Sequence, residues 1–153
     1  MTNKSIINKF QVDFMIKDLV NQINDNNEKF THIVGIANGG LNISIPISKI
    51  LNLPHKSITI RFYGDSKTPN TTPKEINFDQ LNDLNENSNL LFCDDLIDTG
   101  VSFDYLKRNI KFKHKIAVLY HNKNNKYNLM ADYFCYEKPN EWVNFWWDHS
   151  TDV

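Results

Sequence analysis

Apolar side chains at helical spacing predict an amphipathic helix near the start of the chain. It covers about residues 9–24, and the polar run DNNEKF then supplies a turn. Its apolar positions are Phe10, Phe14, Leu19, Val20 and Ile23. A second helix is predicted for LNISIPISKIL, residues 41–51, provided that it begins close to Pro46.

Short apolar runs predict strands, and the first of them is also β-branched. They are HIVGIA (32–37), SITIRF (57–62), NLLFC (89–93) and KIAVLYH (115–121), and a helix is predicted for VSFDYLKRNI (101–110). Strands that alternate with helices are typical of an α/β protein with a central, mainly parallel sheet flanked by helices. The 153 residues fit a single domain, 1–153, with one core.

Two segments depart from this alternation. The polar stretch GDSKTPNTTPKEINFDQLNDLNENS, residues 64–88, has two prolines and no firm period, so we expect part of it to be a mobile loop, with Tyr63 to about Asn77 as the candidate functional part. Long loops in compact domains are often functional. The C-terminal third is rich in aromatic residues, with ADYFCYE and EWVNFWWD as extended segments joined by KPN.

Composition argues against several classes of protein. Lys plus Arg total 17 against 18 for Asp plus Glu, a net charge of -1, which does not suit a nucleic-acid partner. Cys93 and Cys135 lie in apolar runs and form no Cys-x-x-Cys pair, so neither a zinc site nor a disulfide framework is indicated. The sequence shows no signal peptide and no apolar run near the roughly 20 residues that cross a bilayer. We therefore expect a cytoplasmic protein without a membrane partner.

The acidic stretch LLFCDDLIDTG, residues 90–100, is the strongest candidate for a functional site. Its acidic part, which begins at Asp94, follows the third predicted strand, and open parallel sheets bind ligands beyond the carboxyl ends of their strands. Residues 98–102 combine hydroxyl groups, a glycine and a helix N-terminus, which favours a phosphate. Asp94 and Asp95 would repel a phosphate, but they can accept hydrogen bonds from sugar hydroxyls and help to hold Mg²⁺.

A phosphate at one end and a diol at the other describe a ribose 5-phosphate. The surrounding carboxylates would also stabilise positive charge at the anomeric carbon, so the chemistry indicated is transfer at C1 of a phosphoribosyl group. A solvated acidic turn would not require this order of acids, hydroxyls and glycine. A P-loop nucleotide site is excluded, because the sequence contains no G-x-x-x-x-G-K-[ST] motif.

Residues 90–102 resemble the fingerprint of the type I phosphoribosyltransferases: an apolar strand, two acids, two apolar residues, then Asp-Thr-Gly-x-Thr/Ser. The resemblance implies that family's fold, with a small C-terminal hood over about 120–153. It implies that phosphoribosyl pyrophosphate contacts Asp94, Asp95, Asp98, Thr99, Gly100, Val101 and Ser102. Mg²⁺ would be held near Asp94 and Asp95, directly or indirectly. Asp98 would be the catalytic residue that accepts or returns the proton of the base.

A second motif, IVGIANGGL at residues 33–41, resembles the diphosphate-binding loop of the same family. It implies contacts from Asn38, Gly39 and Gly40, because glycines let backbone amides face a diphosphate. A Gly-Gly pair elsewhere would mean no more than a turn. Asn38 is a departure, since purine members commonly carry Arg there, and the missing charge weakens diphosphate binding or requires Arg61 or Lys67. The polar stretch after Tyr63 resembles the segment that closes over the site.

The tail WVNFWWD, residues 142–148, resembles that of bacterial xanthine-guanine phosphoribosyltransferases and implies that Trp142 and Val143 cover the base. An aromatic cluster at a chain end is also often core or interface. The family reads the purine 6-oxo group with a Lys after the fourth strand. Here Asn122 stands at the expected position and Lys123 follows it, and an amide would select 6-oxopurines less strongly than an ammonium group.

The resemblance therefore implies an Mg²⁺-dependent purine phosphoribosyltransferase of purine salvage. Its substrates would be phosphoribosyl pyrophosphate and guanine, xanthine or hypoxanthine. Two alternatives stay open: a non-catalytic phosphoribosyltransferase-like regulator, which Asn38 and the displaced Lys123 would fit, and an enzyme for another base, which the Trp-rich tail disfavours. Relatives form dimers or tetramers, so a homodimer or homotetramer is expected.

Overall fold

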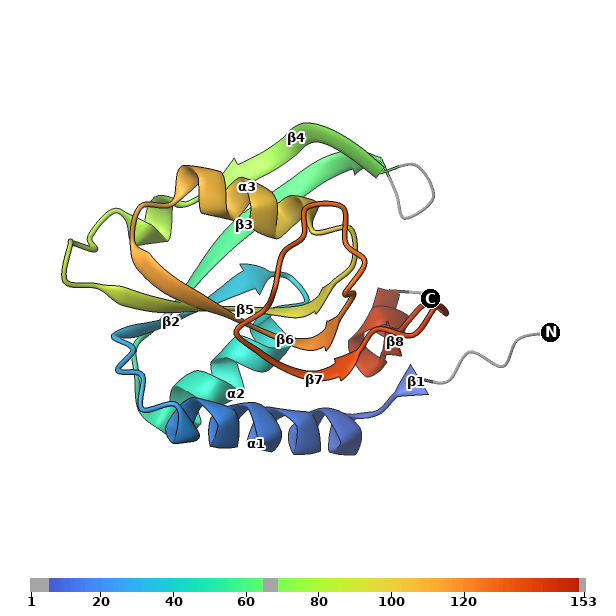
Figure 1. Cartoon of the computed structure of the whole chain (residues 1–153), viewed down its shortest axis with the longest axis horizontal. Coiled ribbons are helices and arrows are strands. Elements are labelled where there is room, and N and C mark those ends of the chain that lie inside the picture. Colours follow the sequence, from blue (N-terminus) through green and yellow to red (C-terminus); the bar gives the residue numbers. More distant parts are fainter. Residues whose placement is uncertain (1–5, 65–68, 152–153) are drawn as a thin grey trace.

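The computed structural model describes residues 6–64 and 69–151 (Figure 1). In chain order, its strands are β1 (Ile6–Ile7), β2 (His32–Ala37), β3 (His55–Gly64), β4 (Pro69–Asn77), β5 (Asn89–Ile97), β6 (Lys113–His121), β7 (Tyr133–Glu137) and β8 (Asn144–Phe145). The helices are α1 (Lys9–Asp25), α2 (Leu41–Leu51) and α3 (Val101–Asn109), with the 3-10 helices η1 (Asp79–Leu81) and η2 (Trp146–Thr151).

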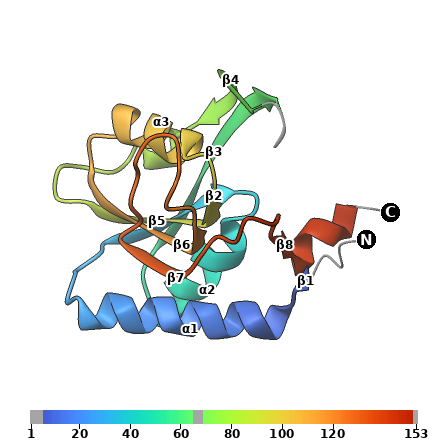
Figure 2. The ribbon, with the colours of Figure 1, turned by 45° about the vertical axis from the view of Figure 1, so that its right-hand side comes forward.

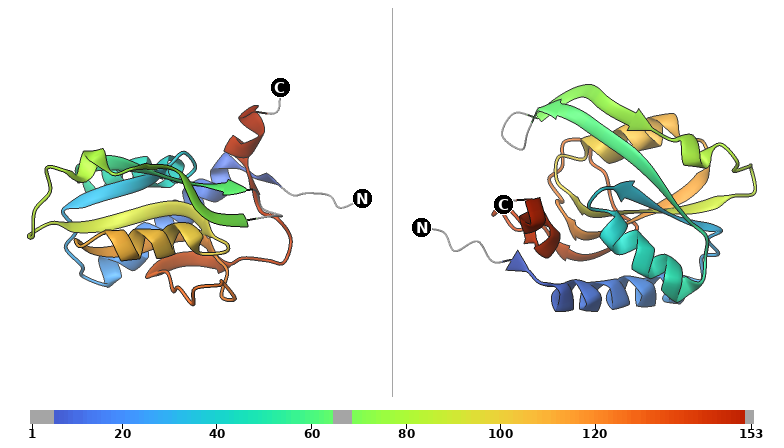
Figure 3. Two further views of the ribbon diagram at one scale, coloured as in Figure 1. Left: turned by 90° about the horizontal axis from the view of Figure 1, so that it is seen from above. Right: turned by 180° about the vertical axis from the view of Figure 1, so that it is seen from behind.

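One six-stranded sheet, in the order β4-β3-β2-β5-β6-β7, forms the centre of the molecule. Its strand pairs are parallel apart from β3 and β4, which are antiparallel. Side chains of β5 alternate between the two faces: Leu91 and Cys93 join the core under α1 and α2, whereas Leu90 and Phe92 join the core under α3. Helices therefore cover both faces, as Figures 1 and 3 show, and the predicted fold class is confirmed.

The first helix begins at a capping box and ends within one residue of its predicted end. Asn8 Oδ1 accepts a hydrogen bond from the Gln11 N–H, and Gln11 Oε1 accepts one from the Asn8 N–H, each at 2.9 Å. Phe10 and Phe14, which were predicted on its apolar face, are instead 79% and 75% exposed. The buried positions are Val12, Met15, Ile16, Leu19, Val20 and Ile23.

In residues 6–64 and 69–151, no helix is both long and apolar enough to cross a membrane.

The close packing of α2 on β2 depends on Gly35. A Cβ atom at this position would lie 2.2 Å from Ser44 Oγ and 2.8 Å from Leu41 Cδ2. Ser44 Oγ also lies 2.8 Å from His55 Nε2 on β3, so it is held in place. The helix can approach the sheet this closely because residue 35 has no side chain. Pro46 lies inside α2 rather than at its start, where it removes one backbone hydrogen bond.

The polar segment after Tyr63 is a strand for much of its length. β4 pairs with β3 in antiparallel register, with Thr59 opposite Asn77. This strand was not predicted, because an edge strand tolerates proline and this ladder shifts register on both sides of Phe62. Residues 65–68, and with them Lys67, lie outside the part of the chain that the structure describes.

The predicted C-terminal hood divides into two parts. β7 is parallel to β6 and forms an edge of the main sheet, so the hood is shorter than predicted and begins at about Lys138. Its remainder lies beyond the carboxyl ends of the strands, where β8 pairs in parallel with β1 and η2 follows (Figure 2). The pairs Ile6–Asn144 and Ile7–Phe145 bring the two ends of the described chain together.

Gly35→Ala is expected to lower the free energy of unfolding by about 1–3 kcal/mol, because the added methyl group overpacks the contact between α2 and β2. Urea denaturation measures this loss. Ser44→Ala removes the Oγ atom that the methyl group would meet, so the double variant should lose less than the sum of the two single variants. If the losses of the two single variants add up fully in the double variant, the contact between residue 35 and Ser44 Oγ does not limit how closely α2 packs on β2.

Candidate functional site

Three loops meet at the carboxyl edge of the sheet. They follow β2, β5 and β6 and contain residues 38–40, 98–100 and 122–129. Because β5 pairs in parallel with both β2 and β6, the three loops lie side by side (Figure 1). The site residues predicted on these loops are therefore brought to one edge, where parallel α/β sheets bind ligands.

A cavity of about 300 Å³ opens between the end of β5, with the loop that follows it, and the hood. Residues 94–103, from the end of β5 and the start of α3, form one wall. Trp142, Val143 and Asp148 form the other. The cavity thus joins the residues predicted to bind the phosphoribosyl group with two of those predicted to bind the base.

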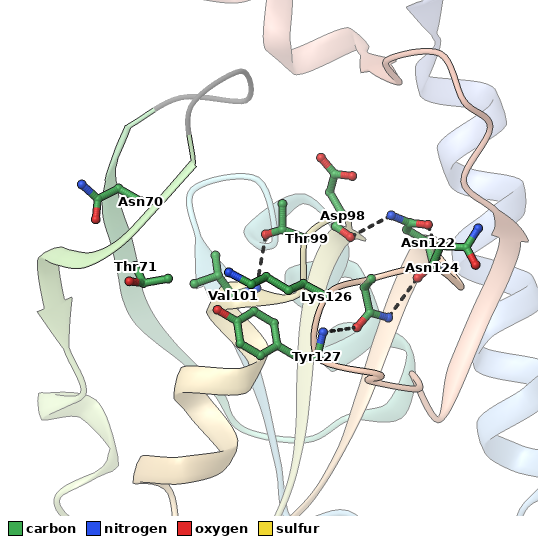
Figure 4. Close-up of a pocket in the computed structure, with 10 residues that line it drawn as sticks. Asn70, Thr71, Asp98, Thr99, Val101, Asn122, Asn124, Lys126 and Tyr127 are labelled. Atoms are coloured by element: carbon green, nitrogen blue, oxygen red, sulfur yellow. Dashed lines mark hydrogen bonds between the residues drawn. The ribbon is translucent and has the colours of Figure 1, made fainter.

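A second cavity of about 190 Å³ shares Asp98, Thr99 and Val101 with the first (Figure 4). Its remaining lining residues are Asn70, Thr71, Asn122, Asn124, Asn125, Lys126 and Tyr127. Asn70 and Thr71 belong to the stretch that was predicted to close over the site, and Asn122 was predicted to read the base. The other four residues were not predicted, because the loop after β6 meets β4 and the loop after β5 through tertiary structure alone. The lining is polar, and Lys126 supplies a cation to it.

Asp94 and Asp95 lie within the end of β5 rather than in the loop after it. Asp94 Oδ1 accepts a hydrogen bond from the Asp95 N–H, and Asp95 Oδ1 accepts one from the Leu96 N–H, both at 2.8 Å. Burial raises the pKa of Asp94 well above its ordinary value, and the neighbouring charge of Asp95 adds to this. Burial also raises the pKa of Asp95. The pair is therefore suited to a ligand that brings hydroxyl donors or positive charge.

The two glycines after β2 are required by close packing. A Cβ atom on Gly39 would lie 2.4 Å from Asp95 Oδ2, and one on Gly40 would lie 2.4 Å from the carbonyl oxygen of Cys93. The Gly40 N–H already donates to the Ile36 carbonyl at 2.9 Å. A diphosphate at this loop would therefore depend on Asn38, which is exposed, and on Gly39 rather than on the Gly40 amide.

The loop from Asp98 to Ser102 forms the start of α3. Gly100 has a φ of 88°, and a Cβ atom there would lie 3.1 Å from Asn125 Oδ1, so both backbone and packing favour glycine. The Val101 N–H donates to Thr99 Oγ1 at 3.3 Å. These residues present a helix N-terminus to the first cavity, as a phosphate requires.

Two tryptophans of the tail have different surroundings. Trp142 lines the first cavity and is 48% exposed, so its ring is accessible to a ligand. Trp147 stacks on Phe145 with ring centroids 4.6 Å apart, and its Nε1 lies 3.6 Å from where a Gly39 Cβ would be. Trp147 therefore packs the tail against the loop after β2, while Trp142 stays available for a base.

Both residues predicted to read the base make other contacts in this arrangement. The Asn122 side chain donates to the Asp98 carbonyl at 3.0 Å and accepts from the Asn124 N–H at 3.0 Å. Lys123 is 53% exposed and forms an ion pair with Glu137. Asn122 thus shapes the loop, and Lys123 is engaged at the surface.

Lys138, which was not predicted, is the lysine beside Asp98. Its Nζ lies 3.7 Å from Asp98 Oδ1, and its side chain is 10% exposed. The sequence does carry a signal for it, because Lys138 follows β7 directly, as Asn122 follows β6. Arg61, the other cation considered, instead pairs with Glu75 at 3.7 Å on the hairpin.

The acidic pair fits a metal that arrives with its ligand. Among the described residues, no group of three or more His, Cys, Asp or Glu side chains is arranged to hold a metal ion. Mg²⁺ is typically bound by one or two carboxylates together with water and substrate phosphates. Asp94 and Asp95 can serve in that way, directly or through water.

The mainly parallel sheet, the acidic end of β5 and the loop that opens α3 define a type I phosphoribosyltransferase fold. The chain belongs to the phosphoribosyl transferase domain family, whose model matches residues 4–153. The family resemblance seen in the sequence is thereby confirmed.

The relatives are distant in sequence, and two solved structures share the fold of this chain. A hypoxanthine-guanine phosphoribosyltransferase of Streptococcus mutans is 27% identical over 117 residues, which cover 72% of this chain and 64% of that protein. A purine phosphoribosyltransferase from Pyrococcus horikoshii has a TM-score of 0.78 at 26% identity, covering 95% of this chain and 94% of that one. A xanthine-guanine-hypoxanthine phosphoribosyltransferase from Helicobacter pylori, 18% identical with a TM-score of 0.73, covers 95% and 92% and shows the shared fold.

The stability of the ligand-free protein is expected to fall as the pH rises above the ordinary carboxyl pKa of about 4. Burial raises the pKa values of Asp94 and Asp95, so the folded state holds protons that the unfolded chain has lost. The free energy of unfolding then decreases with pH until these raised pKa values are passed. Urea denaturation at a series of pH values measures the slope.

Asp95→Asn keeps an oxygen for the Leu96 N–H and removes a titrating group, so it should flatten this slope. Asp104→Asn, on α3, is the matched control and should leave the slope unchanged. An equal slope in the wild type and in Asp95→Asn would contradict the expectation.

Proposed function

We propose that this protein transfers the 5-phosphoribosyl group of phosphoribosyl pyrophosphate to a purine base, yielding a nucleoside monophosphate and pyrophosphate. The observation that carries the proposal is the single cavity that holds Asp94, Asp95, Asp98 and the N-terminus of α3 opposite Trp142. The wall from β5 and α3 offers carboxylates for the ribose hydroxyls and a helix N-terminus for the phosphate, and the wall with Trp142 offers an aromatic ring for the base. The cavity also lies at the carboxyl ends of the strands, where open α/β sheets bind ligands.

The ribose and its phosphate would bind on the β5 side of the cavity. Asp94 and Asp95 accept hydrogen bonds from the two ring hydroxyls, and residues 98–102 donate to the 5-phosphate. As the bond from C1 to the diphosphate breaks, C1 gains positive charge, which the nearby carboxylates stabilise. The hydroxyl contacts also compensate for the burial of the acidic pair.

Mg²⁺, when bound, would neutralise charge on the diphosphate and polarise the bond that breaks. Asp94 and Asp95 are the residues that would hold it, with the remaining ligands from substrate and water. The lining of the first cavity includes four carboxylates, Asp94, Asp95, Asp98 and Asp148, and no Lys or Arg. A substrate rich in phosphate therefore needs a cation to enter it.

Asp98 is the proposed general acid/base. It lines both cavities, is partly exposed, and its backbone carbonyl accepts from Asn122 Nδ2. As the ring nitrogen of the base bonds to C1, the base loses a proton, and a carboxylate at this position can accept it. Trp142 offers a stacking face for the base, and Val143 lies beside it.

The choice of a 6-oxopurine rests on relatives and on the tail. The Streptococcus mutans relative is a hypoxanthine-guanine phosphoribosyltransferase, and the Pyrococcus horikoshii structure is a purine phosphoribosyltransferase. Guanine, hypoxanthine and xanthine are therefore the proposed bases, in purine salvage. The free thiols Cys93 and Cys135 suit a reducing compartment, so the proposed setting is the cytoplasm.

One observation favours a second function. Asn38 leaves the loop after β2 without a charged side chain of its own for the diphosphate. A protein that binds a phosphoribosyl ligand as a signal, without transferring it, would tolerate this loss. Product formation separates the two functions.

The deciding assay incubates the protein with phosphoribosyl pyrophosphate, Mg²⁺ and, in turn, guanine, hypoxanthine, xanthine, adenine, uracil or orotate. We expect nucleotide from the three 6-oxopurines and loss of turnover when EDTA removes Mg²⁺. Binding of phosphoribosyl pyrophosphate without product from any base would favour the regulatory function.

Asp98→Asn should lower turnover by about 10²- to 10⁴-fold, because it removes the proton acceptor. Binding of phosphoribosyl pyrophosphate, followed by calorimetry, should persist in this variant. Asp104→Asn is the matched control, since Asp104 pairs with Arg108 on α3 at 3.0 Å. Full turnover in Asp98→Asn would remove this residue from the mechanism.

We also propose a homodimer or homotetramer, supported by apolar side chains on the surface of α1. Phe10 and Phe14, one helical turn apart, are 79% and 75% exposed. Phe10→Ser with Phe14→Ser should shift the mass found by light scattering toward the monomer, and Ile50→Ser on α2, 55% exposed, is the control. An unchanged mass would place the interface elsewhere or show a monomer.

A further inference from the structure

Lys138, directly after β7, lies beside Asp98, the proposed general acid/base. Its backbone N–H donates to the His121 carbonyl at 2.8 Å, beyond the last residue of the strand. Its Nζ lies 3.7 Å from Asp98 Oδ1 and donates to the Pro139 carbonyl at 3.2 Å. Because its side chain is 10% exposed and a buried ammonium group is costly unless paired, its place beside Asp98 is well defined.

The two residues after β6 that were predicted to read the base, Asn122 and Lys123, make other contacts. Asn122 uses its amide within the loop, and Lys123 pairs with Glu137 on the surface, where their side chains are 53% and 63% exposed. Lys123 would have to break that pair and turn inward to reach a base. Lys138 is already next to the residue that would accept the proton of the base.

We propose that Lys138, rather than Asn122 or Lys123, selects the base, acting together with Asp98. This inference rests on the proposed function. An ammonium group has three N–H donors and no acceptor, so Lys138 can donate to a base while keeping its contacts with Asp98 and Pro139. Asp98 accepts an N–H of the base. The two side chains are complementary to a base edge that carries an N–H beside a carbonyl oxygen.

A 6-oxopurine has such an edge, formed by N7–H and the 6-oxo group. Adenine carries an amino group instead, which would set two donors against each other and leave the Lys138 N–H without an acceptor. During transfer, one ring nitrogen bonds to C1, the bond from C1 to the diphosphate breaks with its electron pair on the diphosphate, and the proton of the base moves to Asp98. Lys138 transfers no proton and keeps its charge throughout.

Equilibrium binding of two nucleotides, inosine 5′-monophosphate and adenosine 5′-monophosphate, tests the inference without requiring turnover. The wild type should prefer the inosine nucleotide by about 10- to 100-fold, the range expected for one charge-assisted hydrogen bond. Lys138→Met keeps the length of the chain and removes the charge, so the preference should disappear. Lys138→Arg should restore part of it, and Lys123→Met, the matched control, should leave it intact.

The inference is overturned if the wild type shows no preference, if it binds neither nucleotide, or if Lys138→Met retains the preference. Loss of the preference in Lys123→Met instead would assign base selection to Lys123. Binding of ribose 5-phosphate serves as the folding control, because its contacts lie on the β5 side of the cavity. A wild type that makes no nucleotide in the panel assay would contradict the proposed function, while the binding preference would still decide the role of Lys138.

Discussion

The burial of two adjacent carboxylates at the end of the central strand is the constraint on which the rest of the site depends. Asp94 and Asp95 are partly buried in the wall of a cavity, and burial raises their pKa values, while each carboxylate accepts a hydrogen bond from a backbone N–H. The neighbouring loop must leave room for them, and Gly39 does so by having no side chain. A ligand that brings hydroxyls and positive charge would relieve this burial, so the same feature that disfavours the empty site favours the occupied one.

The loop after β6 supports the phosphate loop through asparagine side chains. Asn125 is buried and donates to the Asn122 and Leu129 carbonyls at 3.0 and 2.8 Å. Its Oδ1 accepts from the Tyr127 and Leu129 N–H groups at 3.2 and 2.8 Å and lies against Gly100. A stretch whose composition suggests a featureless polar turn is thus a compact structure with its hydrogen bonds made internally.

Local patterns predicted the parts of the fold that local chemistry determines. β2 and α2 have their predicted ends, and the order of the strands along the chain followed from their apolar runs. The hairpin was missed because β4 is an edge strand whose prolines and polar residues resemble a loop. Phe10 and Phe14 were misplaced because spacing alone does not say which side of a helix meets the sheet. Lys138 was missed for a similar reason, since its neighbour Asp98 lies 40 residues earlier and meets it through the β5-β6-β7 order of the sheet.

The pairing of β1 with β8 gives the site a particular order of assembly. β1, at the start of the described chain, pairs with β8, which leads into η2. The wall formed by Trp142, Val143 and Asp148 is therefore held by contacts between distant parts of the sequence. On a ribosome, the sheet and the phosphate loop can form before this wall, because their residues emerge first. The nascent chain would therefore have a phosphate-binding half-site before it has a base-binding one, and substrate discrimination would be the last property to appear.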